Sequence, residues 1–208
     1  ERLQARINSA RRLDHEGHVK AEGIYDVSGR PGLVMQMVIG KDLERIAKRQ
    51  AVPGPVAARI ARDLVDVLEA AAEHDLVHGH MGPNRIIVTD QGRVRLLGLG
   101  MVKGTEVTAE DPLYREDRSV RRYAPPEGLG GLVTSAVDVY ALGSILTRIV
   151  SGRWPKRASQ HAAGQKSVVD GAAHVVAGAG AAPGFVSVVR DCLGFRADLR
   201  PYLKELRD

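Results

Sequence analysis

Three histidines lie close together in the chain, at positions 74, 78 and 80. Imidazole binds zinc, and its pKa near neutrality also suits proton transfer, so this cluster could hold a metal ion or supply a general base. The spacing of His78 and His80 occurs in metal sites, but the only carboxylate or thiol within the span of the cluster is Asp75. His74 ends a segment with a helical pattern, where the helix dipole favours a cation. We therefore predict no metal site here, and we keep His80 as a candidate base.

The segments on either side of the histidines have clear apolar patterns and must position them. Residues 56–74 place apolar side chains at helical spacing, which predicts a long helix that ends at the cluster. Beyond the cluster, alternation over Ile86–Thr89 and residues 94–97 around a short polar turn predicts a hairpin. A second apolar helix is predicted over Ser135–Ser151. The histidine cluster would then lie in a loop between a helix and a hairpin.

The other predicted elements are shorter. Helices are predicted over residues 3–13, 43–48 and 185–193, and after Pro201. Strands are predicted over residues 19–25 and 33–36. Asp42 is the expected N-cap of the helix that starts at residue 43. The stretch 158–183 is rich in glycine and alanine, and we predict irregular structure there with one short helix near residues 168–176.

Residues 78–88, with the sequence HGHMGPNRIIV, resemble the catalytic loop of the protein kinase family, H-R-D-L-K-P-x-N-I-L-V. In that family the Asp accepts the proton of the substrate hydroxyl and the Asn holds a magnesium ion. Here His80 stands at the Asp position, Gly82 at the Lys position and Arg85 at the Asn position. His78 stands at the position of the family's structural histidine. The resemblance implies that the shape of the loop is kept while its reactive residues are replaced.

Further motifs follow in the order of the same family. The sequence RLLGLG at residues 95–100 falls where the family has K-L-x-D-F-G, with Gly98 at the position of the metal-binding Asp. Matches to Y-x-A-P-E, T-x-x-S-D-V-Y-S-L-G, T-G-x-x-P and R-P begin at Tyr123, Thr134, Ser151 and Arg200. The chain thus resembles the bacterial Ser/Thr protein kinases of the eukaryotic-like type over nearly its whole length.

This resemblance implies an α+β, protein-kinase-like fold with two parts. Residues 1–40 would be a remnant of the small N-lobe with the hinge, and residues 41–208 the mainly α-helical C-lobe. If nucleotide binds without a metal, the hinge residues expected to contact it are Gln36, Met37 and Val38. The sequence contains neither the glycine-rich loop nor the V-A-I-K strand that the family has before the helix predicted at residues 3–13, and it does not begin with methionine. We therefore expect either a truncated protein or a fragment of a longer one.

Two further matches concern the shape of the fold. Glu127 matches the carboxylate that pairs with a buried arginine in the family, here Arg200. Asp138 matches the helix aspartate that accepts hydrogen bonds from the backbone of the catalytic loop. A buried carboxylate needs such donors. Its presence beside a loop without the family's reactive residues indicates that the shape of the loop still matters.

The replaced positions lead to a functional hypothesis. Glycine at position 98 supplies no carboxylate, and Arg85 adds a positive charge where a metal ion would bind. Loss of a general base alone typically lowers a rate by ~10²–10⁴-fold. We predict a pseudokinase that is not an enzyme, holds neither ATP–magnesium nor another metal, and acts in bacterial signalling as a scaffold or allosteric regulator of a protein partner. The alternatives are a weak or atypical phosphotransferase that uses ATP and depends on His80, and a basic surface module for anionic lipid or nucleic acid.

Candidate phosphorylation sites lie in the segment that matches the family's activation segment. Thr105, Thr108 and Ser119 lie near several arginines, a setting in which an added phosphate can order a loop. The family's loop arginine that clamps such a phosphate is replaced by Gly79. A solvated loop is therefore the simpler interpretation, and phosphorylation is left open.

The composition is that of an ordinary globular protein with a basic surface. Hydrophobic residues make up 44% and charged residues 26% of the chain, and the net charge is +5. The basic residues are spread along the chain, which is typical of a solvated surface, so nucleic-acid binding is not expected. No apolar run is long enough for a transmembrane helix, and the single cysteine, Cys192, fits a core position and excludes an internal disulfide. We expect a cytoplasmic domain.

Overall fold

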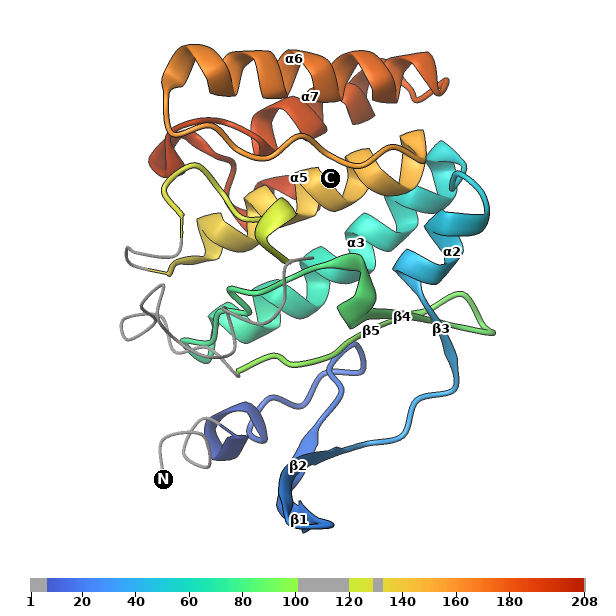
Figure 1. Ribbon diagram of the computed structural model, residues 1–208, viewed down its shortest axis with the longest axis vertical. Coiled ribbons are helices and arrows are strands. Elements are labelled where there is room, and N and C mark those ends of the chain that lie inside the picture. Colours follow the sequence, from blue (N-terminus) through green and yellow to red (C-terminus); the bar gives the residue numbers. More distant parts are fainter. Residues whose placement is uncertain (1–6, 101–119, 129–132, 208) are drawn as a thin grey trace.

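The computed structural model describes residues 7–100, 120–128 and 133–207 and has mixed α and β structure (Figure 1). Its strands are β1 (Ala21–Val27), β2 (Arg30–Met35), β3 (Gly40–Asp42), β4 (Ile86–Thr89) and β5 (Val94–Leu96). Its α-helices are α2 (Leu43–Arg49), α3 (Gly54–Ala72), α5 (Ser135–Ser151), α6 (Ala162–Gly178) and α7 (Pro183–Cys192). Short 3-10 helices are η1 (Pro83–Arg85), η2 (Val120–Arg122), η3 (Ala197–Leu199) and η4 (Leu203–Leu206).

The strands form two small antiparallel sheets. In one sheet β1 pairs with β2, and in the other β4 lies between β3 and β5. The β1–β2 hairpin extends away from the helices at the lower end of Figure 1. The segment before it is tied to β5, because the Val19 amide donates to the Leu96 carbonyl at 3.1 Å and the Leu96 amide donates to the Gly17 carbonyl at 2.7 Å. The hairpin predicted around residues 90–92 is therefore present, and it is joined to the N-terminal part of the chain.

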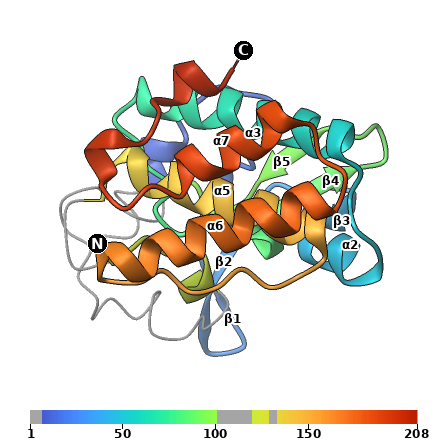
Figure 2. The same cartoon turned by 90° about the horizontal axis from the view of Figure 1, so that it is seen from above.

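Helix α5 is the centre of the core. Every residue from 137 to 150 is buried, as expected for a helix that is apolar on most of its faces. It contacts α2, α3, α6 and α7, and α6 and α7 lie side by side over it in Figure 2. The two long helices predicted from apolar spacing, α3 and α5, are both confirmed. So is the Asp42 cap, whose carboxylate accepts a hydrogen bond from the Arg45 amide at 2.8 Å.

Two predicted elements differ in the structure. The stretch expected to be irregular contains α6, a regular helix of 17 residues. Its buried residues Val168, Ala172 and Val176 recur every four positions and pack on the core, and this packing offsets the cost of the glycines in the helix. The helix expected after Pro201 is only the short turn η4, which is capped by Glu205 accepting a hydrogen bond from the Tyr202 amide at 2.8 Å. Across the three described ranges, none of the helices has both the length and the apolar character needed to cross a membrane.

Candidate functional site

The loop at residues 78–85 is anchored through its backbone to Asp138, in the first turn of α5. The buried Asp138 carboxylate accepts hydrogen bonds from the backbone amides of His78, at 2.9 Å, and Gly79, at 2.7 Å. Burial raises the pKa of the Asp138 carboxyl to about 7, although the two hydrogen bonds act in the opposite direction. Gly79 has a φ of 66°, a left-handed conformation that favours glycine. The backbone of the loop is therefore fixed to the central helix.

His78 fixes the other side of the loop. Its Nε2 lies 3.0 Å from the Leu97 carbonyl, and its Nδ1 accepts a hydrogen bond from the His80 amide at 3.2 Å. This pattern places the proton of the imidazole on Nε2. Burial, together with the nearby Arg85 and His80, lowers the pKa of His78 to about 3. His78 is thus a neutral residue that joins the loop to the end of β5.

The positions that differ from the family's pattern lie on this fixed loop and just after β5. His80 is buried, and its backbone is anchored through His78. Arg85 ends η1, and a side chain at Gly82 would crowd the Asn84 carboxamide, which lies 3.0 Å from the expected Cβ. Gly98 has a φ of 82°, so its backbone also favours glycine. In the described ranges, no group of three His, Cys, Asp or Glu side chains is placed to hold a metal ion.

The ion pair expected between Glu127 and Arg200 is present. Both guanidinium nitrogens Nη1 and Nη2 donate to the Glu127 carboxylate at 2.7 Å. Arg200 also donates to the carbonyls of Ala136 and Gly194, both at 2.9 Å, and its guanidinium lies 5.0 Å from the centre of the Tyr140 ring. The Arg200 side chain is fully buried. This residue therefore joins the segment before α5 to the loops after α7.

The hinge residues lie between β2 and β3. The Gln36 amide donates to the Lys20 carbonyl at 2.8 Å, and the Met37 side chain is 88% exposed. Val38 is half-buried. Other residues singled out from the sequence lie outside the described ranges: Thr105, Thr108 and Ser119.

Sequence reasoning missed a polar and aromatic cluster beside the loop. Arg148 is buried on α5 and its Nη2 lies 3.3 Å from the Glu44 carboxylate of α2. Two guanidiniums lie over the Trp154 ring, that of Arg148 at 4.5 Å and that of Arg122 at 5.1 Å from the ring centre. A hollow of about 200 Å³ adjoins them, lined by Glu44, Lys48, Pro83, Asn84, Tyr123 and Trp154. The signal available in the sequence was Arg148, a basic residue within a mainly apolar helix.

A central buried helix, a catalytic-type loop fixed to it and a small sheet beside the loop define a protein-kinase-like fold. A model of the protein kinase domain matches residues 1–205, and the chain belongs to the protein kinase family.

The chain is similar to several bacterial Ser/Thr protein kinases. It is 29% identical over 164 residues to the serine/threonine-protein kinase PknA of Mycobacterium tuberculosis, a match covering 74% of this chain and 37% of PknA. It is 28% identical over 158 residues to PrkC of Bacillus subtilis, with 74% of this chain and 24% of PrkC covered. A DNA damage-responsive serine/threonine-protein kinase, RqkA of Deinococcus radiodurans, is 28% identical over 167 residues, with 74% of this chain and 24% of RqkA covered. The matches thus cover only 24–37% of the length of these relatives.

These relatives correct one prediction. The replaced positions His80, Arg85 and Gly98 were interpreted as evidence that the chain is not an enzyme. The family is an enzyme family, and the relatives are all named as Ser/Thr protein kinases. The prediction was wrong because it inferred a missing activity from missing residue types and treated the phosphotransferase that depends on His80 only as an alternative.

A test of the loop anchor follows from Asp138. In Asp138→Asn, one amide N–H of the loop would face the NH₂ group instead of an oxygen, and we expect a loss of about 1–3 kcal/mol in the free energy of unfolding. The raised pKa of Asp138 means that the folded state retains its proton above pH 3.8, so this group's contribution to stability falls as the pH rises from about 4 to 7. The stability difference between the two proteins, measured by urea unfolding, should therefore narrow over that range. A difference that widens with pH would contradict this assignment.

Proposed function

We propose that this chain is the domain of an atypical Ser/Thr protein kinase, a phosphotransferase that uses ATP as donor and a protein hydroxyl as acceptor. The observation that carries the proposal is the fixed loop: His78 and Asp138 hold its backbone, and His80 occupies the position of the family's proton acceptor. Residues 41–208 would form the larger lobe, and residues 1–40 part of the smaller lobe with the hinge. Because ATP is a cytoplasmic metabolite, we propose that the domain works in the cytoplasm.

The reaction is divided among few residues. The imidazole of His80 accepts the proton of the substrate hydroxyl while that oxygen attacks the γ-phosphorus of ATP, and the bond to ADP breaks. The family's magnesium does not fit its two ligand positions here, because Arg85 is a cation and Gly98 has no side-chain oxygen. Arg85 lies close enough to His78 to lower the pKa of its imidazole, so its charge is in the loop region. A guanidinium is suited to phosphate oxygens and can offset part of the charge that develops on them.

The proposal is tested by phosphate incorporation from γ-labelled ATP into the chain itself and into myelin basic protein. We expect slow incorporation by the unmodified chain, reduced by ~10²–10⁴-fold in His80→Ala, as for loss of a general base. The matched control is His74→Ala, because His74 is an exposed histidine outside the loop. Equal incorporation by His80→Ala and His74→Ala, or no incorporation by the unmodified chain, would reject the proposal.

A second candidate role is protein–protein binding, as a scaffold or as an allosteric partner of another enzyme. The observation that favours it is Trp154, which is 47% exposed although two arginines hold its ring. Tryptophan and arginine are the residue types that most often carry the binding energy of protein interfaces. The two roles can coexist, because a protein kinase must also bind its protein substrate.

A further inference from the structure

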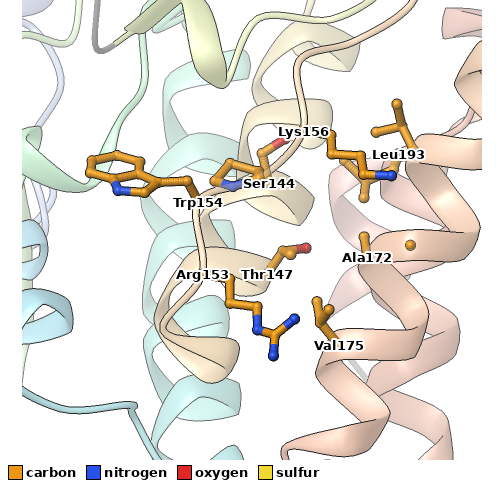
Figure 3. Close-up of a pocket in the computed structure, with 11 residues that line it drawn as sticks. Ser144, Thr147, Arg153, Trp154, Lys156, Ala172, Val175 and Leu193 are labelled. Carbon is orange, nitrogen blue, oxygen red and sulfur yellow. The ribbon is translucent and has the colours of Figure 1, made fainter.

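A second hollow, of about 160 Å³, lies between α5 and α6 (Figure 3), and Trp154 borders both this hollow and the one beside the catalytic-type loop. Thr147 of α5 and Val175 of α6 face each other across it, and Leu193 closes one end. The hydroxyl of Thr147 is already used, because it donates to the Gly143 carbonyl at 2.9 Å. The hydroxyl of Ser144, which also lines the hollow, is hydrogen-bonded to Tyr140, so the walls between the helices are mainly apolar.

Gly171, in the middle of α6, lines the hollow. A Cβ added at Gly171 would meet only the end of the Lys156 side chain, at 3.8 Å from Nζ. Alanine would fit there and would favour the helix by about 1 kcal/mol relative to glycine. Glycine instead leaves the wall open at the level of Lys156. The hollow is thus lined at a position where replacing glycine with alanine would stabilise the helix.

The mouth of the hollow is positively charged. Arg153 and Lys156 line it and both are exposed, and neither forms an ion pair with any residue in the described ranges. Trp154 lies between them in sequence, with its ring held by Arg122 and Arg148. Two cations beside an apolar hollow complement a ligand that is apolar at one point and anionic next to it.

The size of the hollow decides between a small molecule and a protein. Pockets for drug-sized molecules have volumes of about 300–1,000 Å³. A hollow of about 160 Å³ has room for one apolar side chain instead. In protein interfaces, a few buried side chains at the centre commonly carry most of the binding energy, and the contacts around them contribute little.

We propose that this hollow is a docking site for an acidic segment of a protein partner, which inserts one apolar side chain between α5 and α6 and places its carboxylates against Arg153 and Lys156. The site contains no residue of the loop at 78–85. Docking therefore needs neither ATP nor His80, and it can be tested whether or not phosphate transfer is observed.

The test uses a displayed library of random twelve-residue peptides, selected on the unmodified chain. Peptides with an apolar residue flanked by Asp or Glu should be enriched, and synthetic copies should bind ~10-fold or more weakly to Gly171→Leu, which fills the opening. The matched control is Gly178→Leu, the same change on the same helix where an added Cβ meets nothing within 4 Å. This variant should bind within about two-fold of the unmodified chain. The double variant Arg153→Ala with Lys156→Ala should also weaken binding, and added salt should do the same.

Three results would overturn the proposal. One is a selection that enriches no acidic–apolar peptide. Another is a set of enriched peptides that bind Gly171→Leu and Gly178→Leu equally well. The third is binding of octanoate, a small apolar carboxylate, that is lost in Gly171→Leu while no peptide binds. That third result would identify the hollow as a site for a small molecule.

Discussion

Replacing Arg200 with alanine is expected to lower the free energy of unfolding by about 3–5 kcal/mol, the usual cost of breaking a buried ion pair from one side. The Glu127 carboxylate would lose both of its 2.7 Å partners, and the carbonyls of Ala136 and Gly194 would each lose a donor. Because the Glu127 side chain is 31% exposed, water can solvate part of its charge, which places the expected loss in the lower half of that range. Denaturant unfolding followed by circular dichroism measures it.

The matched control is Arg190→Ala. Arg190 also pairs with a carboxylate, that of Asp170 at 3.0 Å, but both side chains are about half exposed. An exposed pair contributes about 0–1 kcal/mol, so this variant should unfold almost like the original chain. Glu127→Gln should fall between the two, because the amide oxygen still accepts one hydrogen bond. If Arg200→Ala and Arg190→Ala were equally stable, burial of the Glu127–Arg200 pair would not matter to the fold.

The elements that could be predicted from the sequence are those whose apolar residues recur without interruption. Helices α3 and α5 have this property, and so does the hairpin of β4 and β5. Helix α6 could not be found in the same way, because its buried face consists of Val168, Ala172 and Val176 among glycines and alanines that also suit a loop. Its packing on α5 and α7 stabilises the helix, and these contacts cannot be seen in the local sequence.

The candidate site was only partly predictable, for a different reason. The loop and its anchors are local motifs, so His78 and Asp138 could be placed from the sequence. The stack of Arg122, Trp154 and Arg148 could not, because these residues come from separate segments and meet only in the folded chain. Activity is harder to predict than structure, because the residue type at a family position indicates which reaction is possible but not its rate.

Restoring the family's two metal positions, with Arg85→Asn and Gly98→Asp together, is expected to make phosphate transfer magnesium-dependent and to raise its rate by ~10²-fold or more. A bound metal ion typically lowers a barrier of this kind by several kcal/mol. The change removes one positive charge and adds one carboxylate, so the site becomes able to attract a divalent cation. The residue introduced at position 98 must adopt a left-handed backbone, with a φ of 82°, at a cost of roughly 1–2 kcal/mol in stability.

The control for that strain is Arg85→Asn with Gly98→Ala, which has the same backbone cost without the carboxylate. Addition of magnesium with ATP should raise the melting temperature of the carboxylate variant and leave that of the alanine control unchanged, because only a folded protein that binds the ligand is stabilised by it. If both variants responded alike, the carboxylate at position 98 would not be what the metal requires. The limit on the rate would then lie elsewhere, at the groups that hold the triphosphate. A response confined to the carboxylate variant would instead mean that the fold can still bind a divalent cation at this loop, and that the charge at positions 85 and 98 is what prevents binding in the unmodified chain.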